Sequence, residues 1–207
     1  MLGRTLTALE QHHPESIFIV VGDRASQVDE YIRENFKHLP ITLLMNQEFK
    51  TRNNFYSLAL AADHIGSHYD QIILFNCDVI FDQSVLDQLI DQDRERSYTV
   101  VRLGACGEEE MKVTVNPERR IQNLSKEINP VAAHGEAVGI HAFSSSFWSR
   151  LKEYLTATKH IHPDKYYEHA IQYVLAEEPL YALGIANTPL MEVDFDEDLR
   201  RAESLFV

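Results

Sequence analysis

Three carboxylates at two points of the sequence have the types and spacing of a metal-binding site. The first, Asp78, closely follows an apolar run from Ile72 to Phe75. A short apolar run bounded by polar residues is typical of a strand buried on both faces of a parallel sheet. Ligands bind such sheets outside the carboxyl ends of the strands, so an acid there is placed for chemistry. The position also suits a residue that only caps the turn after the strand.

The second point lies near the end of the chain. Glu192 and Asp194 alternate with Met191 and Val193 at the period of a strand, so both carboxylates face the same side. Carboxylates at two points on one rim of a sheet suit Mg²⁺, with water and substrate phosphates completing its shell. The ion would neutralise charge on a reacting phosphate. The acids from Asp196 to Asp198 instead suit the start of a helix.

The elements that position these acids alternate in the first half of the chain. Apolar runs predict strands at 17–21, 41–45 and 71–81, and helical patterns fall at 5–12, 26–36, 53–65 and 84–91. Ser26 is the expected N-cap of one helix, and Asn53 or Asn54 opens another. Alternating strands and helices indicate a parallel sheet with crossover helices on its faces.

The second half changes character. Short strands are predicted at 98–103, 111–115, 121–124 and 137–143, with no helix between them. This pattern indicates antiparallel pairing added to the parallel sheet. Helices at 145–155 and 164–176, a strand at 180–185 and a last helix follow. The expected fold class is α/β, a three-layer, mostly parallel sheet with an antiparallel insertion, in a single domain spanning 1–207.

Composition excludes several classes of protein. The formal net charge of −13 argues against non-specific nucleic-acid binding, although a small nucleotide remains compatible with an acidic chain. No run approaches the roughly 20 apolar residues of a membrane-spanning helix, and the first residues lack the apolar core of a signal peptide. The two cysteines, Cys77 and Cys106, lack metal-ligand spacing. Buried, reduced thiols in a cytoplasmic protein are therefore expected.

Six sequence motifs occur in an order that characterises one family. They are Asn46 with 51–58 (TRNNFYSL), 78–81 (DVIF), 124–128 (LSKEI), 135–140 (GEAVGI), 166–168 (YYE), and 192–194 (EVD) ahead of 197–199 (EDL). With these motifs the chain resembles the nucleotidyltransferases of the sugar-phosphate type. It is most similar to their phosphocholine or 2-aminoethylphosphonate cytidylyltransferase branch, over nearly its whole length from about Gly3.

The resemblance implies a Rossmann-like fold and a reaction. The family couples a nucleoside triphosphate, here CTP, to a small phosphorylated substrate and releases pyrophosphate. The acids matching Asp78 and Asp194 hold Mg²⁺, and the position of Glu192 assists. In-line attack on the α-phosphate brings anions together, so positioning and charge neutralisation do most of the work. Lys126 would be the catalytic cation for the incoming phosphate; the alternative is a solvated lysine in a turn.

The resemblance also points to residues that contact the substrate. Tyr166, Tyr167 and Glu168 would form an aromatic, acidic pocket for a quaternary ammonium group, through cation–π contact. The alternative is that this helix packs its tyrosines into the core. Glu136 lies just before a buried strand and should be partnered, either in a structural ion pair or by substrate.

Three further residues belong to the expected cleft. Asn53, Asn54 and Tyr56 would line the nucleotide or substrate site. Asn53 is equally suited to be a plain helix cap.

The sequence departs from the family pattern at its beginning. The family's first strand and Gly-rich loop, which ends in a Pro-Lys pair, have no counterpart here, and no Gly-x-Gly occurs in the sequence. Backbone amides of such a loop bind phosphate, so we expect little or no turnover by the chain as given. The absent strand would be central, so its neighbours should be left unpaired. Cys77 also replaces a common glycine, and Phe195-Asp196 replaces a common Thr-Pro.

Three interpretations follow from these departures. The first is a cytidylyltransferase-type enzyme whose N-terminal segment is missing from this chain. The second is a non-catalytic binding or scaffold protein of the same fold, with a homodimer through an exposed sheet edge. The third is a metal-dependent glycosyltransferase, for which Asp194-Phe195-Asp196 resembles the Asp-x-Asp pattern.

Overall fold

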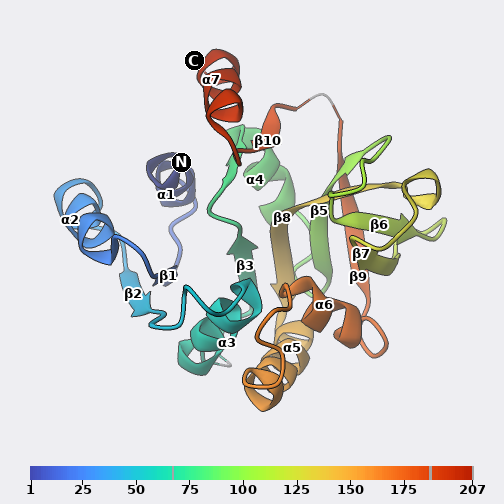
Figure 1. The fold of residues 1–207 in the computed structure, drawn as a ribbon, viewed down its shortest axis with the longest axis horizontal. Helices are drawn as coiled ribbons and strands as arrows, with labels where there is room; N and C mark the ends of the chain where they lie inside the picture. Colours follow the sequence, from blue (N-terminus) through green and yellow to red (C-terminus); the bar gives the residue numbers. More distant parts are fainter. Residues whose placement is uncertain (67, 187, 207) are drawn as a thin grey trace.

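Strand β3 (Gln71–Phe75) lies between two layers of helices (Figure 1). The computed structural model describes residues 1–66, 68–186 and 188–206. Side chains of a strand point alternately to opposite faces. Accordingly, Ile72 and Leu74 pack into one core cluster, whereas Ile73 and Phe75 pack into another. The first cluster lies under α3 (Asn54–His64), α5 (Ser145–Thr158) and α6 (Glu168–Val174), and the second under α4 (Gln83–Ile90).

The N-terminal part forms its own small sheet. Strands β1 (Ile17–Val21) and β2 (Ile41–Met45) pair in parallel and in register from Ile17↔Ile41 to Val21↔Met45. Helices α1 (Leu2–Glu10) and α2 (Ala25–Asn35) cover one face of this pair, where Leu6, Ile17, Ile32 and Phe36 are buried together.

The larger sheet has the order β7-β6-β8-β5-β9, with β3 also paired to β8. Its strands are β5 (Ser97–Leu103), β6 (Lys112–Val115), β7 (Ile121–Ser125), β8 (Gly135–Ser144) and β9 (Leu180–Ile185). All ten residues of β8 are buried, because β8 is flanked by strands and covered on both faces. A short 3-10 helix (Pro130–Ala132) precedes β8.

A third sheet pairs a strand from the middle of the chain with a strand near its C-terminal end. Strand β4 (Val79–Phe81) pairs antiparallel with β10 (Leu190–Glu192), with Val79 opposite Glu192. Helix α7 (Asp196–Leu205) follows and packs Ala202 against Ile80 and Met191. None of the helices in the described ranges is long and apolar enough to cross a membrane.

The expected α/β class, with helices on both faces of a central sheet, is confirmed. The sheet is mixed rather than mostly parallel, because β3 pairs antiparallel with β8. Among the described strands, β1 pairs only with β2 and β3 only with β8, as expected if a strand between them is absent. The predicted homodimer through such an edge stays a prediction.

Three predicted elements have different bounds. The strand at 71–81 is interrupted by a turn at 76–78, which separates β3 from β4. Helix α2 begins at Ala25 rather than after Ser26, because Arg24 takes up a left-handed conformation with φ 54°. Helix α6 begins at Glu168 instead of Asp164, because the preceding segment is bound to the start of α3: Pro163 O accepts from Asn53 N, and Tyr167 N donates to Asn54 Oδ1.

Candidate functional site

Asp78 lies in the turn between β3 and β4 and is half-buried. Its backbone oxygen accepts a hydrogen bond from Val193 N at 2.9 Å, directly after β10. This bond continues the β4–β10 ladder, so the chain segment with Glu192 and Asp194 is held beside the Asp78 turn. Asp78 and Asp194, which are more than one hundred residues apart in sequence, thus lie on neighbouring segments of the fold.

The electrostatics of this segment are those of a carboxylate cluster. Burial raises the pKa of Asp78, and the charge of Asp194 raises it further. Burial raises the pKa of Glu192 to about 7, with added repulsion from Glu136, Asp78 and Asp194. Like charges close together disfavour ionisation, so these groups are electrostatically coupled. A bound cation would relieve that repulsion.

The donor set fits a divalent cation. Asp78 Oδ1 is buried and has no hydrogen-bond partner among the described residues, which is a costly state for a carboxylate. Within 1–66, 68–186 and 188–206 no three His, Cys, Asp or Glu side chains are close enough to form a preformed metal cluster. Mg²⁺ does not require one, since it keeps several waters and is held by one or two carboxylates plus substrate phosphates.

Glu136, at the start of β8, has the partner that its burial demands. Arg102 on the adjacent strand β5 donates a short hydrogen bond to Glu136 Oε2, and the two residues are cross-strand neighbours. Burial nevertheless raises the pKa of Glu136, because the arginine offsets only part of the desolvation. The structural ion pair is therefore present, and its negative charge also acts on Glu192.

A buried hydrogen-bond network links His141 and Tyr167 to Asn76, which lies two residues before Asp78. Tyr167 is 2% exposed, and its hydroxyl donates to Asn76 Oδ1 at 2.8 Å and contacts His141 Nε2 at 3.2 Å. Burial lowers the pKa of His141 to about 3, so the ring is neutral. Because the Tyr167 hydroxyl donates its proton to Asn76, His141 Nε2 carries the ring proton and donates to the Tyr167 oxygen, while Nδ1 has no partner in the described residues. Tyr167 is thus a core residue that holds the Asp78 turn.

Asn76 and His141 were not predicted from the sequence. Gly139 permits this arrangement: it has φ +68°, and a Cβ there would lie 2.4 Å from Asn76 Nδ2. A signal existed for His141, since an ionisable residue inside an apolar strand must find a buried partner. Nothing in the sequence indicated which partner.

Glu168 is the first residue of α6, and Lys126 directly follows β7. Glu168 is 6% exposed, and burial raises its pKa to about 7, although the charge of Lys126 lowers it. Its Oε2 is buried without a partner in the described part of the chain. Lys126 Nζ lies 5.0 Å from the ring centroid of Tyr166, which is 43% exposed. The expected aromatic and acidic groups are therefore neighbours, but the tyrosine ring already faces a lysine.

The remaining predicted residues have structural contacts. Asn53 caps α3 by accepting from Asn54 N at 2.7 Å, so the cap alternative is confirmed. Asn54 accepts from Tyr167 N at 3.0 Å and so positions the network. Tyr56 is buried, and its ring faces the guanidinium of Arg52 at 5.0 Å. None of the recorded contacts of Tyr56 reaches the carboxylate cluster.

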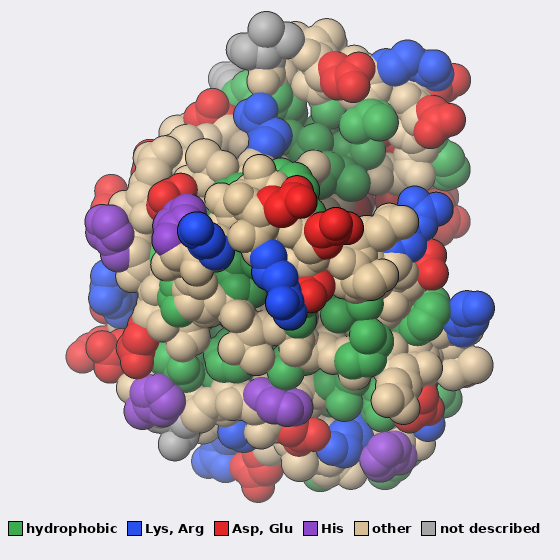
Figure 2. All heavy atoms as spheres, turned by 90° about the vertical axis from the view of Figure 1, so that its left-hand side faces the viewer, with side chains coloured by type: hydrophobic (Ala, Val, Ile, Leu, Met, Phe, Trp, Pro, Cys, Tyr) green, Lys and Arg blue, Asp and Glu red, His purple; other side chains and the backbone are tan. Residues whose placement is uncertain are grey.

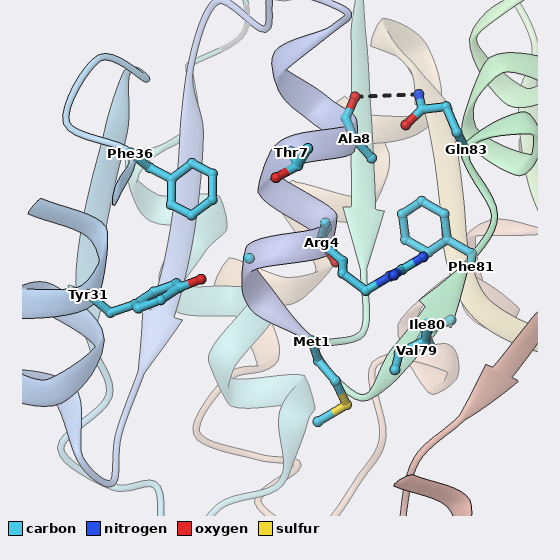
Figure 3. A pocket seen from close by; sticks show the side chains of 12 residues that line it. Met1, Arg4, Thr7, Ala8, Tyr31, Phe36, Val79, Ile80, Phe81 and Gln83 are labelled. Carbon is cyan, nitrogen blue, oxygen red and sulfur yellow. Dashed lines mark hydrogen bonds between the residues drawn. The ribbon is translucent and has the colours of Figure 1, made fainter. Parts of the chain in front are cut away.

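A cavity lies beside the carboxylate cluster, and Val79, the residue after Asp78, is part of its lining. It measures about 530 Å³ between α1, α2 and β4. Figure 3 shows α1 standing between Tyr31 and Phe36 on one side and Phe81 on the other. Arg4 is the one charged side chain in its lining, and this arginine also donates to Phe206 O.

The face that carries α1 and α2 is drawn in Figure 2. Hydrophobic side chains gather around a hollow in its upper part, while Lys and Arg lie singly among Asp and Glu. This face therefore has no continuous basic stripe of the kind that follows a nucleic-acid backbone.

Comparisons with known proteins agree on one family. A family model described as the MobA-like NTP transferase domain matches residues 1–170. The choline-phosphate cytidylyltransferase of Haemophilus influenzae is 30% identical over 105 residues. The match covers 49% of this chain and 39% of the relative's length. This chain therefore matches well under half of that relative.

Solved structures show the same fold. The CTP:phosphocholine cytidylyltransferase from Streptococcus pneumoniae superposes with a TM-score of 0.77 at 16% identity, covering 100% of this chain and 85% of that chain. The inositol-1-phosphate CTP transferase from T. maritima gives 0.76 at 20% identity, covering 95% and 77%. Such low identities establish the shared fold alone.

Proposed function

Because this chain belongs to the MobA-like NTP transferase domain family, we propose that it is a Mg²⁺-dependent cytidylyltransferase. It transfers CMP from CTP to a small phosphorylated or phosphonate head group, such as phosphocholine, and releases pyrophosphate. The name of the Haemophilus influenzae relative supports this choice of nucleotide and acceptor.

The observation that carries the proposal is the unpartnered carboxylate of Asp78 beside a second acidic segment. Asp78 Oδ1 is buried without a partner in the described residues, and the backbone bond to Val193 brings Glu192 and Asp194 to the same turn. Asp78 and Asp194 would hold Mg²⁺, and Glu192 would assist. When bound, the ion supplies positive charge that offsets the negative charge developing on the α-phosphate.

The chain's own residues position the acceptor. Lys126 carries the positive charge that would bind the acceptor phosphate. Glu168 and Tyr166 lie beside it and offer a buried carboxylate and an aromatic face to a quaternary ammonium. Tyr167 and Asn54 hold this segment in place through their hydrogen bonds. Glu136 stays paired with Arg102 and adds to the negative potential at the metal acids.

The acceptor and the nucleotide are tested together by product analysis. The protein is mixed with Mg²⁺ and an equimolar amount of one nucleoside triphosphate, because the sequence lacks a Gly-x-Gly loop and slow turnover is expected. Phosphocholine, 2-aminoethylphosphonate and glucose 1-phosphate are compared. We expect pyrophosphate and a CDP-linked product with CTP and a cationic head group. Transfer to glucose 1-phosphate alone, or from a purine nucleotide alone, would contradict the proposal.

A non-catalytic binding protein of the same fold is the second candidate. It is favoured by the open edges of β1 and β3, each of which pairs with a single strand among the described residues. This candidate predicts that CTP and phosphocholine bind, as measured by calorimetry, while no pyrophosphate is released. The first candidate predicts binding together with slow release that requires Mg²⁺, measured with protein equimolar to nucleotide, so one protein preparation separates the two.

A further inference from the structure

Lys126 lies over the ring of Tyr166, with its Nζ 5.0 Å from the ring centroid. Lys126 makes no hydrogen bond and no salt bridge that the structure records within the described ranges, although the chain carries a net charge of −13. By contrast, Arg52 over Tyr56 is also bound to Glu48 at 2.8 Å. The ring of Tyr166 is thus the recorded partner of the Lys126 ammonium.

The ring of Tyr166 is accessible, and a buried acid follows it closely in the sequence. Tyr166 is 43% exposed, and its hydroxyl has no recorded hydrogen bond in the described residues. Two residues later, Glu168 is almost fully buried with an unpartnered oxygen, close enough for Lys126 to act on its charge. A cation at the ring face is therefore favoured by the aromatic quadrupole, and also by this carboxylate above pH 7, where it is ionised.

We propose that the face of Tyr166 is a cation site that Lys126 occupies in the free protein, and that a substrate bearing both an ammonium and a phosphate group displaces it. The substrate ammonium then contacts the ring of Tyr166, and the substrate phosphate binds the released ammonium of Lys126. This inference rests on the proposed function, because it assigns Lys126 to the acceptor phosphate and Tyr166 to its head group.

The exchange follows from the relative strength of the two contacts. A cation–π contact at an exposed site is weaker than a charge-assisted bond from lysine to phosphate, so Lys126 moves toward phosphate when phosphate is present. A phosphate ester that has no cationic group can bind Lys126 but makes no cation–π contact with Tyr166, so its binding free energy has no contribution from the ring. Tyr166 and Lys126 therefore select zwitterionic acceptors over sugar phosphates, by roughly fivefold from the ring contact alone.

The test uses the full chain, tetramethylammonium as the cation and inorganic phosphate as the anion, at constant ionic strength and without nucleotide. In the chain labelled with ¹³C-lysine, the methylene next to Lys126 Nζ should be shifted upfield by the ring of Tyr166. The shift should disappear when both ions are added. In Tyr166→Leu it should be absent from the start.

Affinities provide the second readout. Lys126→Met should bind tetramethylammonium about fivefold more tightly than wild type, because the ring is free. In wild type, phosphate should tighten tetramethylammonium binding, and in Lys126→Met it should have no such effect. Lys165→Met is the matched control, since it removes an exposed lysine next to Tyr166 that has no recorded ring contact and should behave as wild type.

Two results would overturn the proposal. One is a Lys126 signal that keeps its ring shift with both ions bound. The other is tetramethylammonium binding to Lys126→Met that is no tighter than to wild type, or absent. Since no nucleotide is present, the exchange is measured whether or not the protein transfers CMP, and a failure of CMP transfer leaves these readings unaffected.

Discussion

Val193 N donates to Asp78 O at 2.9 Å, and this backbone bond extends the β4–β10 pairing that joins the middle of the chain to its end. It sets the Asp78 turn beside Glu192 and Asp194 and so creates the carboxylate cluster. The cluster is held by main-chain pairing of β4 with β10, not by side-chain contacts between the acids. The acids thus remain free to bind a cation.

Glu168 makes the stability of the protein depend on pH. Its pKa is raised from an ordinary 4.5 to about 7 in the folded state by burial, so the folded state binds the proton more tightly than the unfolded state. The free energy of unfolding therefore falls as pH rises from about 4.5 to about 7, by up to roughly 3 kcal/mol. Glu168→Gln should be more stable than wild type at pH 8 and equal to it at pH 4.

Urea unfolding between pH 4 and pH 8 measures this difference. Glu34→Gln, an exposed glutamate on α2, is the control and should follow wild type at every pH. If the free energy of unfolding changed with pH in the same way for wild type and Glu168→Gln, Glu168 would not be the source of the pH dependence.

The Tyr167 hydroxyl is predicted to stabilise the fold. Tyr167→Phe leaves His141 Nε2 and Asn76 Oδ1 without their partner in the buried network. We expect a loss of about 1–3 kcal/mol in the free energy of unfolding, since unsatisfied buried polar groups are costly. Tyr173→Phe, on the same helix but 56% exposed, should change stability little. Equal effects of the two substitutions would refute the network's role.

Gly139 is predicted to be required by the Asn76 turn. Gly139→Ala places a Cβ at φ +68° and 2.4 Å from Asn76 Nδ2. Backbone strain and the clash together should destabilise the protein by about 1–3 kcal/mol. Gly107→Ala meets nothing nearer than Glu110 Oε1 at 3.7 Å and should be nearly neutral. Thermal unfolding of both variants tests this, and a neutral Gly139→Ala would contradict the geometry.

Much of the fold follows from local pattern. The strands at 17–21, 41–45 and 180–185 have the bounds that their apolar runs predict. Each of these runs is apolar along most of its length, and Pro40 and Pro179 stand directly before two of them. The start of α6 was missed because it depends on hydrogen bonds from Asn53 and Asn54, more than one hundred residues earlier in the chain.

The candidate site was predictable only in part. Asp78 was predicted because it follows an apolar run, and Asp194 because it alternates with apolar residues at the period of a strand; their roles as ligands stay a prediction. Asn76 and His141 escaped, since their roles depend on pairing across β3 and β8. The face of Tyr166 was predicted as a cation site, but its occupation by Lys126 depends on a tertiary contact that no local pattern encodes.

The most direct test of the account compares Asp78→Asn with Asp70→Asn. Asp70 is an exposed acid at the opposite end of β3, so both variants lose one negative charge near the same strand. The measurement is the first-order rate of Mg²⁺-dependent pyrophosphate release from CTP and phosphocholine, with protein in excess over CTP. We predict that Asp78→Asn lowers this rate about a hundredfold or more, whereas Asp70→Asn leaves it near wild type. Equal rates for the two variants would contradict the assignment of Asp78 to the reacting centre.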